Sequence, residues 1–132
     1  MSYQQAGVLD NVPLYVEAKT LAILIMRAIP SFPKAYKYTI GNEIQKSAIR
    51  VMRNIALAVH ASSGEERLRA VALHQAEFEL LKGYLDIAFE MKCFGGDVFG
   101  KMTKHVLSIG RQSTAWKRSL EKGCGQNRQG QG

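Results

Sequence analysis

Two seven-residue patterns overlap in residues 99–122, which read FGKMTKHVLSIGRQSTAWKRSLEK. In the first, apolar or small residues recur at steps of three and four and so share one face of a helix: Phe99, Met102, Val106, Ile109, Ser113, Trp116 and Leu120. In the second, basic residues recur on the opposite face and form what we call the basic ridge: Lys104, Arg111, Arg118 and Lys122. The segment is predicted to be an amphipathic helix with a buried seam and an exposed basic ridge.

Small residues separate the cations of the basic ridge. Ser108 and Ala115 occupy the intervening positions on the same face, so a polyanion could lie close to the helix surface. Nucleic acid is therefore a candidate partner. Trp116 could stack on a base, but its heptad position favours packing in the core.

Three more helices are predicted upstream, and each has clear end signals. The predicted ranges are 13–29, 39–60 and 63–92, and the helix described above is expected to run from an N-cap at Asp97 to about Lys122. Pro13 suits the first turn of the first helix, and the proline-rich residues 30–33 end it. Ser63 and Glu66 have the spacing of a capping box at the start of the third helix.

Length and composition limit the fold class. The chain has 132 residues, of which 46% are hydrophobic, and only three prolines. That length suits one domain with one hydrophobic core, and no useful stretch alternates polar and apolar residues as a strand does. The predicted fold is an all-α, antiparallel up-down-up-down four-helix bundle over residues 1–122. The Gly- and Gln-rich residues 123–132 are predicted to form a disordered tail, because they cannot bury enough apolar surface to offset the entropy of ordering.

The charge of the chain is unevenly distributed. The formal net charge is +7, and the sequence pI near 9.6 favours polyanionic partners. Residues 1–33 sum to zero, 34–60 to +4, 61–92 to −2 and 93–132 to +5. The second predicted helix therefore adds a further basic set, formed by Lys46, Arg50 and Arg53, on the side opposite its buried stripe.

No catalytic or cofactor-binding constellation is present in the sequence. None of the histidines, His60, His74 and His105, follows a glutamate by three positions, as a di-iron bundle requires. His74 lies one turn before Glu77, a spacing that favours a surface pair or a core histidine over a pair of metal ligands. No phosphate-binding glycine loop is present, and no base is placed beside a nucleophile. The protein is predicted not to be an enzyme and to need neither metal nor cofactor.

The cysteines and the N-terminus indicate the compartment. Cys93 and Cys124 lack metal-ligand spacing, and both are predicted to be reduced thiols. The first residues lack the charged start and apolar stretch of a secretory signal, and the longest purely apolar run, residues 21–26, is too short to span a membrane. The protein is predicted to be cytoplasmic.

Several short motifs resemble those of a known family. Residues 32–34 read FPK, 38–41 read YTIG, 44–48 read IQKSA and 54–56 read NIA. With the layout of residues 14–122, they resemble the bacterial four-helix bundle family that includes proteins encoded in the intervening sequences of 23S ribosomal RNA. Proteins of that branch usually continue Asn-Ile-Ala with Glu-Gly, whereas Leu57 and Ala58 follow here, which counts against the branch.

The C-terminal part looks more like the accessory variability determinant proteins of diversity-generating retroelements. The residues that carry this likeness are 110–116, the Lys/Arg-rich end and the Gly/Gln tail. The resemblance implies a ring-like homo-oligomer, a homopentamer, whose basic surface binds the reverse transcriptase of the element and its template RNA or cDNA.

The resemblance also suggests roles for individual residues. The residues expected to bind nucleic acid or the polymerase are Lys46, Arg50, Arg53, Lys104, Arg111, Arg118 and Lys122. Subunit contacts would come from the very apolar first helix and from the wide apolar face of the third, with Leu73, Leu80, Tyr84 and Ile87.

Two other functions remain open at this point. One is a general RNA-binding bundle of the intervening-sequence type, which would bind RNA without a polymerase partner. The other is an oligomeric scaffold whose basic faces are only solvated. A gene next to a reverse transcriptase and a variable repeat would favour the retroelement function over the first alternative.

Overall fold

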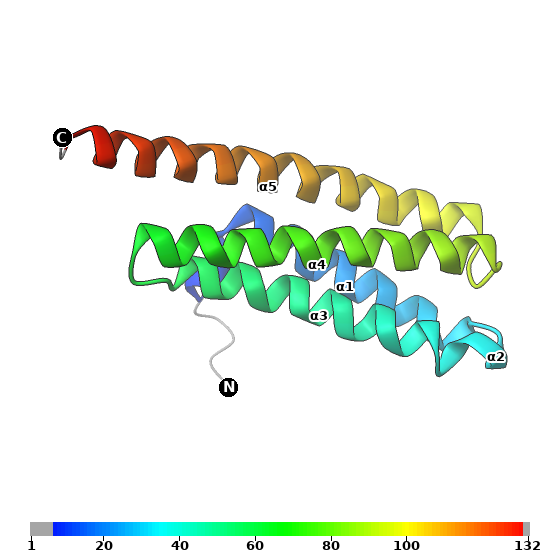
Figure 1. Ribbon diagram of the computed structural model, residues 1–132. Helices are drawn as coiled ribbons and strands as arrows, with labels where there is room; N and C mark the ends of the chain where they lie inside the picture. Colours follow the sequence, from blue (N-terminus) through cyan, green and yellow to red (C-terminus); the bar gives the residue numbers. More distant parts are fainter. Residues whose placement is uncertain (1–6, 131–132) are drawn as a thin grey trace.

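Four long helices make up most of the chain (Figure 1). The structure is a computed structural model that describes residues 7–130, and their side chains as far as residue 123. The long helices are α1 (Pro13–Ala28), α3 (Ile40–Val59), α4 (Gly64–Glu90) and α5 (Gly96–Gly130). Short turns accompany them: η1 (Val8–Asn11), η2 (Ile29–Ser31) and α2 (Lys34–Lys37). No strand occurs between residues 7 and 130, and the predicted all-helical, four-helix fold is confirmed.

The four long helices occupy the corners of a bundle. α1 packs against α3 and α5, and α4 packs against the same two helices. Figure 1 shows α4 between α3 and α5, with α1 behind. α1 and α4 therefore lie at opposite corners, and α3 and α5 occupy the other two. None of the described helices is long and apolar enough to cross a membrane.

The helix ends follow local sequence signals. Pro13 occupies the first turn of α1, where its missing N–H costs no hydrogen bond. α4 ends at Glu90, and two residues later Lys92 lies in the left-handed region at φ 59°. The Lys92 and Cys93 amides donate back to the Phe89 and Ala88 carbonyls. This is a Schellman motif, which normally has glycine at the left-handed position. It turns the chain towards α5.

The capping box predicted at the start of α4 is present in a modified form. The Ser63 hydroxyl accepts a hydrogen bond from the Glu66 amide at 3.1 Å. The Glu66 carboxylate accepts from the Ser62 amide at 2.7 Å, rather than from the amide of Ser63. Both contacts satisfy N–H groups that have no partner inside the helix.

Replacing the cap is expected to lower stability measurably. Ser63→Ala should cost about 1 kcal/mol of unfolding free energy, because the Glu66 amide loses its acceptor. Urea unfolding followed by circular dichroism measures the change. Ser62→Ala is the matched control, since Ser62 acts through its backbone amide. An equal loss in both variants would contradict the assigned cap.

Helix α5 differs from its predicted bounds at both ends. It begins at Gly96, so Asp97 lies in the first turn and is not the N-cap, and the Gly95 carbonyl accepts from the Phe99 amide. At the other end the backbone stays helical to Gly130, beyond the end expected near Lys122. The sequence has no proline there to interrupt the ladder of hydrogen bonds. The tail predicted over residues 123–132 is thus helical as far as Gly130, and residues 131–132 lie outside the described part.

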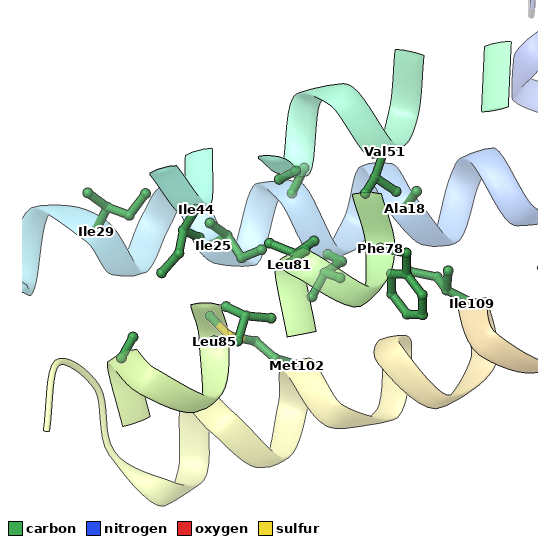
Figure 2. Packing of buried hydrophobic residues seen from close by; sticks show 14 of the residues in the cluster. Ala18, Ile25, Ile29, Ile44, Val51, Phe78, Leu81, Leu85, Met102 and Ile109 are labelled. Carbon is green, nitrogen blue, oxygen red and sulfur yellow. The ribbon is translucent and has the colours of Figure 1, made fainter. Parts of the chain in front are cut away.

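The core is continuous through all four long helices (Figure 2). Its most deeply buried aliphatic side chains, each at most 1% exposed, include Leu21, Ile25, Ile44, Ile55, Leu81, Met102 and Ile109. A smaller cluster of Ala58, Ala70 and Val71 lies beside it, and Trp116 packs against both clusters. The predicted packing role of Trp116 is confirmed, although its side chain is only partly buried.

Candidate nucleic-acid interface

The basic ridge lies on the exposed side of α5. Lys104, Arg111, Arg118 and Lys122 are all exposed, while Met102, Ile109 and Ser113 on the other face of the helix are buried. At a rise of 1.5 Å per residue the ridge is about 27 Å long. None of its four side chains takes part in an ion pair among the described residues. Their charges are therefore available to an external polyanion.

The basic set on α3 differs from the basic ridge because one of its three residues, Arg50, forms an ion pair. Lys46 and Arg53 are exposed, but the Arg50 Nε donates to a Glu77 carboxylate oxygen on α4 at 2.8 Å. This hydrogen bond and the Glu77 charge raise the pKa of Arg50 above its usual value. The other Glu77 oxygen accepts from the buried Ser47 hydroxyl at 2.7 Å. Arg50 is thus held in a contact between helices that reduces its capacity to bind phosphate.

The two basic sets do not come together within one protomer. α3 and α5 are at opposite corners of the bundle, and each packs against α1 and α4. The Glu77 contact also draws Arg50 towards α4. The chain therefore has two separate basic surfaces, and the sequence alone did not predict this separation.

A groove between α4 and α5 runs along the basic ridge. From α4 it is lined by Gln75, Phe78, Glu79 and Lys82, and from α5 by Val106, Leu107, Gly110, Arg111, Ser113, Thr114, Ala115 and Arg118. Two of the four ridge cations thus border a groove in whose α5 wall half of the lining residues are small: Gly110, Ser113, Thr114 and Ala115. Such a wall lets an extended ligand approach the backbone closely.

Lys82 is a groove residue that sequence reasoning missed. Its Nζ lies 5.2 Å from the centroid of the Phe78 ring and 2.7 Å from a Glu79 carboxylate oxygen. It belongs to the block with negative net charge, so the charge pattern gave no reason to select it. Only the packing of α4 beside α5 places it in the groove.

Two histidines connect helices. His105 on α5 donates from Nδ1 to a Glu17 carboxylate oxygen on α1 at 2.6 Å. His74 on α4 is fully buried, and its Nε2 is 2.6 Å from the Ser113 hydroxyl on α5. Burial lowers the pKa of His74 from 6.5 to about 4, against a weaker opposing effect of the Val51 backbone. Both histidines make contacts between helices that stabilise the bundle.

His74, one turn before Glu77 in the sequence, is thus a core residue and not part of a surface pair. His74 contacts Ser113, and Glu77 contacts Ser47 and Arg50 instead. Within the described residues, no group of three or more His, Cys, Asp or Glu side chains is arranged to hold a metal ion. Cys93 is a buried free thiol whose pKa is raised by burial, and the side chain of Cys124 lies outside the described part.

Comparison with known families identifies the bundle. The model of the bAvd-like family, named for the bacterial accessory variability determinant, matches residues 16–120. The chain belongs to the bAvd-like family. The match extends from α1 into α5 as far as residue 120 and includes Arg111 and Arg118 of the basic ridge. None of the curated proteins matches the chain.

Membership sets the general class of function. The bAvd-like family is an accessory family and not a catalytic one, and it points to a supporting role in diversity-generating retroelements. The resemblance inferred from the sequence motifs is confirmed at the level of the family.

Proposed function

We propose that this chain is a non-enzymatic accessory protein of a diversity-generating retroelement. It acts in the cytoplasm as a ring-like homo-oligomer, a homopentamer, built from up-down-up-down bundles. Its basic surfaces bind the template RNA or cDNA and the reverse transcriptase, and so support mutagenic cDNA synthesis. Family membership supports the accessory role, and the short connections between the long helices favour the proposed topology.

The proposal that the protein binds nucleic acid rests on the basic ridge. Its cations are exposed, free of ion pairs in the described chain and spread along about 27 Å of α5. Contacts of this kind neutralise phosphates and read no base edges, so binding tolerates different sequences and weakens with salt. Specificity then comes from the polymerase and from the shape of the RNA.

The α3 surface is assigned to the reverse transcriptase. Lys46 and Arg53 are exposed there at a distance from the ridge, and Arg50 is already engaged by Glu77. Two separated cations suit acidic side chains on a folded partner better than a continuous phosphate backbone. The two surfaces allow RNA and polymerase to be bound at the same time.

Two double charge-reversal variants, one on α5 and one on α3, test the two assignments separately. Arg111→Glu with Arg118→Glu is expected to abolish RNA binding at moderate salt but to leave capture of the reverse transcriptase intact. The salt dependence of RNA binding should fall by about 0.7 in slope for each phosphate of a single strand that the variant no longer neutralises. Lys46→Glu with Arg53→Glu is the matched variant on α3, expected to lose the polymerase and keep the RNA.

The readouts are a salt series of RNA titrations and a pull-down of the polymerase with and without nuclease. Retention of both ligands by the α5 variant, with its helix content unchanged, would refute the role of the basic ridge. RNA binding by the wild-type protein without any capture of the polymerase would favour a general RNA-binding bundle. Absence of both activities would favour a scaffold.

A further inference from the structure

The outer face of α4 carries an exposed apolar seam at heptad spacing. We call it the α4 seam: Leu73, Ala76, Leu80, Gly83 and Ile87 follow one another at steps of three and four, and all are exposed. The three large side chains of the seam are 57%, 53% and 51% exposed. A Cβ added at Gly83 would meet nothing within 4 Å, so a second helix could approach closely there. This is the pattern by which one helix packs along another.

A second seam of the same kind lies on α1. The α1 seam consists of Val16, Lys19, Ile23 and Met26, again at steps of three and four and all exposed. Val16 and Ile23 are each 41% exposed, although they belong to the helix that otherwise buries most of its aliphatic residues. Neither seam contributes to the core of its own bundle.

The two seams cannot cover each other within one protomer. α1 and α4 are at opposite corners, and each turns its buried face inward towards α3 and α5. Their partners must therefore come from outside the bundle. A molecule with two different complementary faces associates head to tail, and this arrangement closes into a ring when the rotation between copies allows it.

The charges beside the seams indicate that each is the partner of the other. Exposed Lys19 lies within the α1 seam and exposed Arg27 lies beside it, and the only acidic residue of α1, Glu17, is engaged by His105. Exposed Asp86 and Glu90 flank the end of the α4 seam. At the other end of the α4 seam, exposed Arg69 lies four residues before Leu73. The basic α1 seam fits the acidic end of the α4 seam, whereas two copies of the α1 seam, or two parallel copies of the α4 seam, would bring like charges together.

We infer that the α1 seam of one copy packs against the α4 seam of the next, forming a head-to-tail contact between copies of this chain. The inference rests on the homo-oligomer in the proposed function and assigns the surfaces that build it. The contact leaves the basic ridge on α5 outside the interface. Assembly and RNA binding can therefore be tested independently.

One glutamate in each seam tests the contact. Ile23→Glu and Leu80→Glu place a charge in the centre of the α1 and α4 seams at exposed positions, so each variant should keep the helix content of the wild-type protein. Light scattering after size exclusion is expected to give an oligomer for the wild-type protein and a monomer for each variant. An equal mixture of the variants should form a dimer, because it retains one intact α1 seam and one intact α4 seam.

Leu107→Glu is the matched control. Leu107 is 60% exposed on α5, so it presents a comparable apolar surface outside both seams, and its variant should keep the wild-type mass. A monomeric wild-type protein, an oligomer that survives either seam variant, or a mixture that stays monomeric would overturn the inference. RNA titration of the same monomers separates this result from the proposed function, because loss of assembly with RNA binding retained leaves the basic ridge assignment standing.

Discussion

Lowering the pH from 7 to 4 is expected to cost the folded protein about 3 kcal/mol through one residue, His74. Its side chain is fully buried between α4 and α5, and burial lowers its pKa from 6.5 to about 4. Each unit of pKa difference between the folded and unfolded states corresponds to about 1.4 kcal/mol. The neutral imidazole is therefore part of the native structure.

The sign follows from which state binds the proton. Below pH 6.5 the unfolded chain protonates His74, whereas the folded chain does not until the pH approaches 4. The unfolded state thus binds more protons in this window, and the free energy of unfolding falls as the pH falls. Above 6.5 the contribution is fully present, and below about 4 no further loss comes from this group.

Urea unfolding at a series of pH values measures the effect. His74→Gln keeps a group that can hydrogen-bond to Ser113 but does not titrate, so its stability should vary less between pH 6.5 and 4 than that of the wild-type protein. In His105→Gln, the part of the pH dependence of stability that comes from His74 should be the same as in the wild-type protein, because this substitution changes only the contact with Glu17. An unchanged pH dependence in His74→Gln would show that the buried imidazole is not the titrating group.

Much of the secondary structure could be predicted because its signals are local. The heptad pattern of residues 99–122 predicted an amphipathic helix, and α5 buries Met102 and Ile109 on the expected side. Ser63 and Glu66 predicted the start of α4 from their spacing alone. These features depend on residues a few positions apart, which the sequence displays directly.

The arrangement of the candidate site could not be predicted in the same way. Periodicity indicates which side of a helix is buried but not which helix will cover it. Arg50 was selected as a free cation, yet Glu77 lies within 2.8 Å of it because α3 and α4 are neighbours. The groove that brings Lys82 to the edge of the basic ridge likewise exists only once α4 lies beside α5.

On the apolar face of α4, periodicity likewise did not predict which individual residues are covered within the bundle. Tyr84 was grouped with three exposed residues of the α4 seam, but it packs against the core of the bundle. Leu73, Leu80 and Ile87 keep more than half of their surface in solvent. Exposed apolar residues at steps of three and four on an otherwise well-packed helix form a surface that another helix can cover.

Phe78→Ala is expected to be the most damaging single truncation in the contact between α4 and α5, at about 3 to 5 kcal/mol. The ring is 3% exposed, lies beside Ile109 in Figure 2 and stacks on His74 with centroids 6.1 Å apart. A Cβ built on Gly110 would lie 3.9 Å from the Phe78 ring, so α5 already approaches the ring closely. After truncation of Phe78, α5 could therefore not easily move in to fill the space that the ring had occupied. The cost is therefore that of the lost burial together with that of a cavity.

Leu80→Ala on the same helix is the matched control. Leu80 is 53% exposed and is expected to change the free energy of unfolding by less than about 0.5 kcal/mol. Comparable losses in the two variants would mean that Leu80 is buried by another copy under the conditions of the measurement. Repeating the unfolding in the Ile23→Glu background removes that contribution and leaves the loss at Phe78 unchanged, because Phe78 stabilises the protomer and Leu80 only the assembly.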